Sequence, residues 1–181
     1  MGDSCDDGAK ARMIRLCFHG AESTGKSVLA ERLSAELGCP WVPEFGREYC
    51  EERGTDLVRA DLLAIAAGQD AAMTRAAACN PPLLILDTDP LMTAAWAQML
   101  LGEVPDQLLR YAKAEHYLLF EADVPWVADG TRFFGAAQDR TEFAALAEEM
   151  LKRAGVRFER IAGNWDERER QVRAVISGAL P

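Results

Sequence analysis

Short apolar runs alternate with longer amphipathic segments along most of this chain. The runs at Met13 to Phe18, Leu83 to Leu86 and Tyr117 to Phe120 are largely apolar, which is typical of strands buried on both faces of a sheet. Weaker strand candidates lie at Trp41 to Val42 and at Val156 to Ile161. Because helical segments separate these runs, the pattern predicts an α/β domain, with a parallel sheet of about five strands and helices on both of its faces.

The segments between the strands predict the helices. The clearest begins at Thr141, where apolar residues recur at the i, i+3, i+4 spacing of an amphipathic helix. The last helix is expected to begin with a capping box formed by Asp166 and Glu169. The other expected helices cover 26–37, 44–53, 61–78, the segment from Met92 to Leu100 and a short segment after Pro105. Residues 1–12 are polar and aperiodic, so we expect a flexible leader before one domain over 13–181.

Composition narrows the function classes. The chain has 181 residues and a formal net charge of −9, which disfavours binding to nucleic acids and to anionic membranes. No apolar run approaches the roughly 18 residues that a membrane span needs, so we expect no membrane partner. The five cysteines form no Cys-x-x-Cys pair. This pattern indicates free thiols in a reducing cytoplasm rather than a zinc site or a disulfide framework.

A glycine-rich loop follows the first predicted strand and precedes a predicted helix. It fits the phosphate-binding pattern G-x-x-x-x-G-K-[ST] without a mismatch. In such loops the backbone N–H groups surround phosphate oxygens, the lysine reaches the β- and γ-phosphates, and the final hydroxyl binds Mg²⁺. The expected ATP-binding residues here are Gly20, Ala21, Glu22, Ser23, Thr24, Gly25, Lys26, Ser27 and Val28, and Ser27 is also an expected metal ligand.

The rest of the sequence favours a small kinase over other proteins with this loop. The guanine-reading Asn-Lys-x-Asp of a GTPase is absent. Carboxylates follow two predicted strands, Glu44 after the second and Asp87 with Asp89 after the third, and ligands gather at such strand ends in parallel sheets. One carboxylate could orient an acceptor hydroxyl and another could hold Mg²⁺. The alternative for Glu44 and Asp89 is a place at a helix N-terminus.

Other residues are candidates for the acceptor side. Phe45 and Tyr49 are one helical turn apart and could hold a flat base between them, or pack into the core. Arg47 could pair with Glu44, touch phosphate or remain on the surface. Trp96 recurs at helical spacing with Met92 and Met99, so the three share one face of the expected helix. That face could pack into the core or line a substrate pocket.

A lid is expected over about 125–140, where the segment combines aromatic, glycine and arginine residues. Arg132 and Arg140 could close over the transferring phosphoryl group, stabilise its charge and exclude water. Asp129 is a further candidate for substrate binding. The alternative is that both arginines are ordinary surface residues.

Taken together, these segments resemble the ribosylnicotinamide kinase domain of NadR-like NAD-synthesis proteins. The resemblance rests on the phosphate loop, on Val42 to Tyr49, on Leu86 to Asp89, on the Pro-Trp-Val-x-Asp-Gly-x-Arg segment from Pro125 to Arg132, and on Asp139 to Phe143. It covers about residues 13 to 178 and implies a P-loop kinase core. It also implies phosphorylation of the 5′-hydroxyl of nicotinamide riboside by ATP, with Mg²⁺, giving nicotinamide mononucleotide.

The resemblance assigns further roles. Glu44 looks like the carboxylate that deoxynucleoside kinases use as a base, which makes it a rival to Asp87, and both are assigned jointly to the acceptor hydroxyl and Mg²⁺. Asn164 and Trp165 are expected beside the adenine. Nicotinamide riboside is a cation, and Glu44, Glu48, Asp87 and Asp89 would suit it. The chain leaves no room for the adenylyltransferase or DNA-binding domains of bifunctional NadR proteins, so we expect it to stop at the mononucleotide.

Two other functions remain open at this stage. The first is a kinase for a different nucleoside or small metabolite, which a substrate panel would detect. The second is a nucleotide-binding regulatory switch, which would hydrolyse ATP slowly and without dependence on any alcohol. The oligomeric state is left open.

Overall fold

A computed structural model describes residues 12–125 and 137–180. Its sheet has five strands in the order β2-β3-β1-β4-β5, and every strand pair is parallel. The predicted fold class is therefore confirmed. The elements along the chain are β1 (Ile14–Gly20), α1 (Lys26–Leu37), β2 (Trp41–Val42), α2 (Phe45–Arg53), α3 (Arg59–Ala77), β3 (Leu83–Asp87), α4 (Pro90–Leu101), α5 (Asp106–Arg110), β4 (His116–Phe120), α6 (Ala137–Arg153), β5 (Phe158–Ile161) and α7 (Trp165–Ala179).

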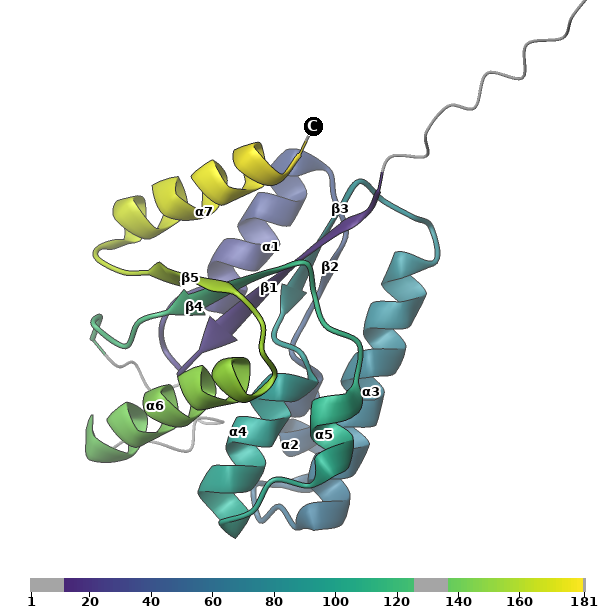
Figure 1. Cartoon of the computed structure of the whole chain (residues 1–181), viewed down its shortest axis with the longest axis vertical. Helices are drawn as coiled ribbons and strands as arrows, with labels where there is room; N and C mark the ends of the chain where they lie inside the picture. The colour runs from purple at the N-terminus through teal and green to yellow at the C-terminus, as the bar shows by residue number, and fades with distance from the viewer. Residues whose placement is uncertain (1–11, 126–136, 181) are drawn as a thin grey trace, which may run out of the picture.

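Helices cover the two faces of the sheet in separate groups (Figure 1). Side chains alternate along each strand, so Leu16 and Phe18 of β1 pack with α1 and α7. Cys17 of β1 and Tyr117 of β4 point the other way, into a core formed with α3, α4, α5 and α6. Both faces of the central strands are thus buried, which explains why these strands are apolar throughout.

The boundaries differ from the expected ones at two places that matter for the site. Strand β1 continues to Gly20, so the phosphate loop leaves the sheet at its first glycine. Helix α7 begins at Trp165 and its capping box is formed by Asn164 and Glu167, whose side chains each accept the other's backbone N–H at 3.0 and 2.8 Å. The predicted capping box at Asp166 and Glu169 is therefore wrong. Glu169 instead forms ion pairs with Arg32 and Arg173.

The expected lid overlaps the start of α6, which begins at Ala137. Residues 126–136, which include Asp129 and Arg132, lie outside the described residues. Within the described ranges, no helix combines the length and the apolar character that crossing a membrane requires.

Candidate active site

The phosphate loop connects β1 to the N-terminus of α1. Gly20 has φ 126°, and a Cβ there would lie 2.4 Å from the backbone oxygen of Phe120 on β4. Gly25 has φ 83° and is the N-cap of α1. Only glycine adopts such conformations at this close approach without strain. The loop therefore needs both glycines of the sequence pattern, and it ends on the N-terminal dipole of α1, which favours anions.

Lys26 is folded back onto this loop. Its ammonium donates to the backbone oxygens of Gly20 at 2.8 Å and Ala21 at 2.6 Å, and the residue is only 8% exposed. Burial lowers the pKa of Lys26, while the charges of Asp87, Glu44 and Glu22 raise it. The backbone oxygens of the loop thus accept the hydrogen bonds of the buried ammonium, which a bound phosphate could accept in their place.

Asp87 ends β3 beside this lysine. It is 1% exposed, and its Oδ1 atom is buried and makes no hydrogen bond within the described part of the chain. Burial raises the pKa of Asp87, while the charge of Lys26, a hydrogen bond from Ser27 and the charge of Arg47 lower it. An unsatisfied buried carboxylate oxygen beside the Ser27 hydroxyl fits the ligand set that the sequence predicts for Mg²⁺. In the described ranges no site has three or more His, Cys, Asp or Glu side chains placed to bind a metal.

Thr88 holds the strand end in a strained conformation. Its φ is 74°, which is an outlier for a β-branched residue and costs about 1–3 kcal/mol. Its N–H donates to the backbone oxygen of Phe18 at 3.1 Å, and its own oxygen accepts a hydrogen bond from Gln69 at 3.3 Å. Strain of this kind persists only where the surrounding structure enforces it.

Glu44 faces Asp87 from the N-terminus of α2. Burial and, second, repulsion by Asp87 raise the pKa of Glu44 to about 7, although the charges of Lys26 and Arg47 act in the opposite direction. A carboxylate with a pKa near the working pH is suited to general base chemistry. The structure thus brings Lys26, Glu44 and Asp87 together, as the sequence predicts.

Two cavities meet at this cluster. The first contains the phosphate loop, including Gly20, Gly25, Lys26 and Ser27. The second lies between α2, α3 and α4, and its inner wall is lined by Leu57, Leu62, Ile65 and Gln69. The cavities share a wall formed by Glu22, Glu44, Arg47, Thr88, Met92 and Trp96. A phosphate held in the first cavity and an alcohol held in the second would therefore face each other across Glu44.

A third cavity lies on the other side of the phosphate loop, against α7. It is lined by Thr24, Gly25, Val28, Trp165 and Arg168, among others. Trp165 is 56% exposed and its ring lies against Gly25, where a Cβ would be 2.5 Å away. This arrangement suits a flat base whose phosphates extend into the loop. Asn164 is the N-cap of α7 and does not line this cavity.

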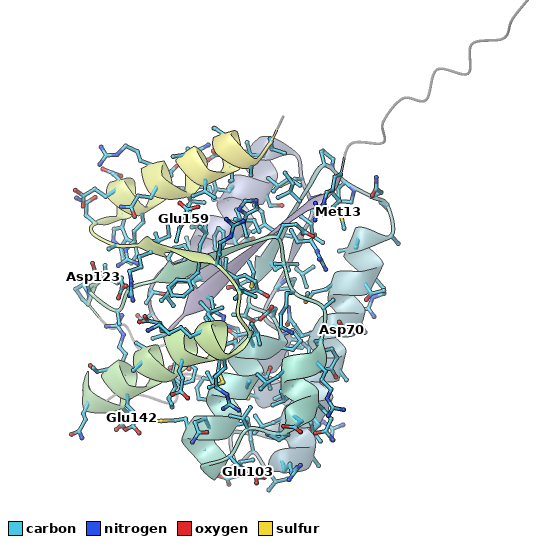
Figure 2. The ribbon with its side chains drawn as sticks, in the orientation of Figure 1. Met13, Asp70, Glu103, Asp123, Glu142 and Glu159 are labelled. Atoms are coloured by element: carbon cyan, nitrogen blue, oxygen red, sulfur yellow. The ribbon has the colours of Figure 1, made fainter. Side chains whose placement is uncertain are left out.

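Sequence reasoning missed Arg168, which organises that third cavity. It is 1% exposed and donates to the backbone oxygens of Thr24, Gly163 and Glu121. It also pairs with Asp123, which lies after β4 on the side of the α7 N-terminus (Figure 2). One buried guanidinium therefore joins the phosphate loop to the segments that follow β4 and β5.

Several expected substrate residues lie elsewhere. Both carboxylate oxygens of Asp89 are occupied, one by the N–H of Leu91 at 2.9 Å and the other by the Tyr117 hydroxyl at 2.5 Å. Asp89 is therefore the N-cap of α4 and not a substrate ligand. Glu48 is exposed and lines neither cavity. Among the described residues, the carboxylates of Glu22 and Glu44 line both cavities, and Asp87 lies buried beside Lys26.

The expected aromatic clamp does not form around these cavities. The rings of Phe45 and Tyr49 have centroids 6.4 Å apart, but neither residue lines the two cavities. Phe45 packs against Gly68 of α3, and the Tyr49 hydroxyl donates to Asp61 at 2.6 Å. Of the aromatic residues that the structure describes, Trp96 lines both cavities, and its ring packs on Phe143 with centroids 4.5 Å apart.

Arg140 also has a different place from the expected one. It donates to the backbone oxygens of Glu22 and Ser23 at 3.3 Å and of Val124 at 2.7 Å, and it does not line the phosphate cavity. It therefore contacts the phosphate loop through the backbone oxygens of Glu22 and Ser23. Among the described arginines, Arg47 is the one that lines both the phosphate and the acceptor cavity.

Comparisons with known proteins show the family to which the chain belongs. A family model described as an AAA domain matches residues 15–168. The chain belongs to that family. The resemblance to NadR-like proteins is also confirmed: the chain is 33% identical over 149 residues to the trifunctional NAD biosynthesis/regulator protein NadR of Escherichia coli, covering 78% of this chain and 36% of that protein. The NadR of Salmonella typhimurium is 33% identical over 146 residues. The chain thus spans about a third of the length of these relatives.

Solved structures share the fold of this AAA-domain chain. A NadR protein in complex with NR superposes with a TM-score of 0.78 at 21% identity, over 92% of this chain and 51% of that one. A deoxyadenosine kinase from M. mycoides superposes with a TM-score of 0.67 at 12% identity, over 91% of this chain and all of the other. At these identities the comparison establishes the common fold.

Proposed function

We propose that this chain is an ATP-dependent kinase that phosphorylates the 5′-hydroxyl of nicotinamide riboside. The observation that carries the proposal is that the phosphate-loop cavity and a second cavity share a wall, which includes Glu44, Arg47 and Thr88. A regulatory nucleotide switch has no need for such an acceptor space. The similarity to NadR of Escherichia coli and the NR complex of a NadR protein support this choice of acceptor.

In this mechanism the chain's own groups bind ATP at three points. The loop N–H groups and Lys26 hold the β- and γ-phosphates, so the ammonium exchanges its present backbone partners for phosphate oxygens. Trp165 contacts the adenine. Ser27 and Asp87 hold Mg²⁺, which when bound supplies positive charge to the phosphate oxygens.

Glu44 orients the acceptor and takes its proton. The acceptor oxygen forms a bond to the γ-phosphorus as the bond to the β–γ bridging oxygen breaks, and the hydroxyl proton passes to the Glu44 carboxylate. Arg47 is placed on the shared wall, where it can stabilise the negative charge that develops between donor and acceptor. The products are ADP and the phosphorylated riboside, and no phosphoenzyme is formed.

The preference for a cation follows from the balance of charge around the shared wall. Glu22, Glu44 and Asp87 carry up to three negative charges, against the two positive charges of Lys26 and Arg47. Once Lys26 and Arg47 engage phosphate and Asp87 engages Mg²⁺, the carboxylates of Glu22 and Glu44 on the shared wall can attract the positive pyridinium ring. The apolar inner wall formed by Leu57, Leu62 and Ile65 can hold the flat face of that ring.

The deciding experiment incubates the protein with Mg·ATP and nicotinamide riboside and detects the mononucleotide by mass spectrometry. Uridine, cytidine, adenosine and deoxyadenosine serve as competing acceptors at equal concentration, and Lys26→Ala is the inactive control. Formation of nicotinamide mononucleotide at the highest rate of the panel supports the proposal. Faster phosphorylation of another nucleoside would show that this nucleoside, and not nicotinamide riboside, is the preferred acceptor. Slow ATP hydrolysis that no alcohol accelerates would indicate a nucleotide-binding regulatory switch.

A further inference from the structure

Gln69 of α3 forms a bridge beneath the active site. The residue is 2% exposed, which is unusual for a glutamine in a helix. Its Oε1 atom accepts the backbone N–H of Phe45 at 2.8 Å, and its Nε2 atom donates to the backbone oxygen of Thr88 at 3.3 Å. One partner is a donor and the other an acceptor, so the two contacts also determine which position the amide oxygen takes and which the amide nitrogen takes.

The two partners of Gln69 are the neighbours of the two active-site carboxylates. Phe45 directly follows Glu44 at the start of α2, and Thr88 directly follows Asp87 at the end of β3. Thr88 has φ 74° and is also held by β1, through its N–H bond to Phe18. A single side chain therefore connects the backbone that carries Glu44 to the backbone that carries Asp87.

The segment around Gln69 is shaped for this contact. The adjacent residue, Gly68, lies so close to the Phe45 ring that a Cβ there would be 2.2 Å from it. This allows α2 and α3 to approach closely enough for the Phe45 N–H to reach Gln69. A glutamate would turn one oxygen toward the Thr88 oxygen, and an apolar residue would leave both backbone groups without their partner.

We propose that Gln69 is a positioning residue that holds Glu44 and Asp87 at the separation required for phosphoryl transfer. The proposal rests on the kinase function given above, but its structural half can be tested without catalysis. Glu44 is faced by Asp87 from β3, Lys26 from α1, Arg47 from α2 and Glu22 from the phosphate loop. If the bridge is lost, Glu44 can move away from Asp87 and gain water, so its pKa should fall from about 7 toward its ordinary value.

The test compares Gln69→Met with Gln69→Asn and with the control Met73→Ala in the full chain. Methionine has a similar size and neither hydrogen bond, and asparagine is one methylene too short to reach both partners. Met73 lies one turn further along α3 in the core, is 4% exposed and touches neither cavity. Carbon-13 NMR of the Glu side chains, with Glu44 identified from the Glu44→Gln spectrum, follows the titration, and steady-state assays give kcat and KM.

We expect Gln69→Met to lower the apparent pKa of Glu44 by about one unit or more and to lower kcat by roughly 10- to 100-fold, with each KM changed less than threefold. Gln69→Asn should lower the Glu44 pKa and kcat in the same direction but by less. If Gln69→Met does not fold, the result for Gln69→Asn tests the proposal. Met73→Ala should lower stability and leave the Glu44 titration in place.

Three results would overturn the proposal. The first is an unchanged Glu44 titration in the Gln69 variants. The second is a rise in the acceptor KM alone in these variants, which would make Gln69 a substrate ligand. The third is a shift of the Glu44 pKa in Met73→Ala as large as that in Gln69→Met. If the wild-type chain phosphorylates no acceptor, the proposed function fails, whereas the titration still decides whether Gln69 positions Glu44.

Discussion

Replacing Glu44 with glutamine should stabilise the nucleotide-free protein at alkaline pH while it abolishes most of the activity. The pKa of Glu44 is raised from an ordinary value of 4.5 to about 7 in the folded state. Between these values the folded state binds more protons than the unfolded state, so the free energy of unfolding falls as pH rises. Above pH 7 the folded protein bears the full cost of a charged carboxylate that is partly buried beside Asp87.

The size of this effect follows from the two pKa values. Integration of the proton linkage between pH 5 and pH 8 gives a loss of about 2 to 3 kcal/mol from Glu44 in the wild type. Glutamine has no charge to bury, so Glu44→Gln should not show this loss. Relative to wild type, the variant should therefore gain about 2 to 3 kcal/mol of stability between pH 5 and pH 8, and its kcat should fall by roughly 10²- to 10⁴-fold because the base is missing.

Urea unfolding followed by tryptophan fluorescence at pH 5, 6, 7 and 8 measures this difference, without nucleotide. The matched control is Glu48→Gln, an exposed glutamate one turn further along α2 that lines neither cavity. It controls for the loss of one glutamate at a position outside both cavities. A pH-independent difference for Glu44→Gln would refute the reasoning, because Glu44 would then titrate alike in the folded and unfolded chain.

Four further substitutions test the rest of the site. Lys26→Ala should lower kcat/KM for ATP by roughly 10²- to 10³-fold, measured by steady-state kinetics. Asp87→Asn should raise the Mg²⁺ concentration needed for half-maximal activity about tenfold or more, in a titration at constant ATP, whereas Asp89→Asn should lower the melting temperature and leave the Mg²⁺ titration unchanged, since Asp89 is bonded to Tyr117 and Leu91. Trp165→Ala should raise the KM for ATP roughly 2- to 10-fold through lost stacking and leave the acceptor KM unchanged.

The sheet and the phosphate loop were predictable from sequence because each follows from a local pattern. A strand buried on both faces must be apolar throughout, so Leu83 to Leu86 could be read directly from the residues. The loop needs two glycines at a set spacing, because Gly20 approaches the backbone of β4 and Gly25 caps α1 with a positive φ. In both cases the required residue type is visible without knowledge of distant contacts.

The directions of side chains at the strand ends could not be predicted in this way. Asp87 and Asp89 are two residues apart and chemically alike, but the left-handed conformation of Thr88 separates them. Asp87 faces Lys26, and Asp89 turns to the Tyr117 hydroxyl on β4. Which of the two remains available depends on a tyrosine that lies 28 positions away along the chain, so no local pattern reveals it.

Buried polar residues were the second kind of feature that sequence patterns concealed. Arg168 lies within the charged run from Asp166 to Arg170, where nothing in the sequence distinguishes it from its less buried neighbours. It is buried because backbone oxygens from three segments converge on its guanidinium, which is what allows a buried charge. Gln69 similarly lies in an Ala-rich helix, and only the positions of Phe45 and Thr88 reveal its contacts.

The destabilising features of this fold are concentrated where ATP and Mg²⁺ are expected to bind. Glu44 and Asp87 repel each other, the Asp87 Oδ1 atom lacks a hydrogen bond within the described residues, and Thr88 has a strained φ. A cation near Asp87 and phosphates near Lys26 would relieve the first two. Mg·ATP should therefore raise the unfolding free energy by more in the wild type than in Asp87→Asn, because the variant has less unfavourable charge for the ligand to relieve.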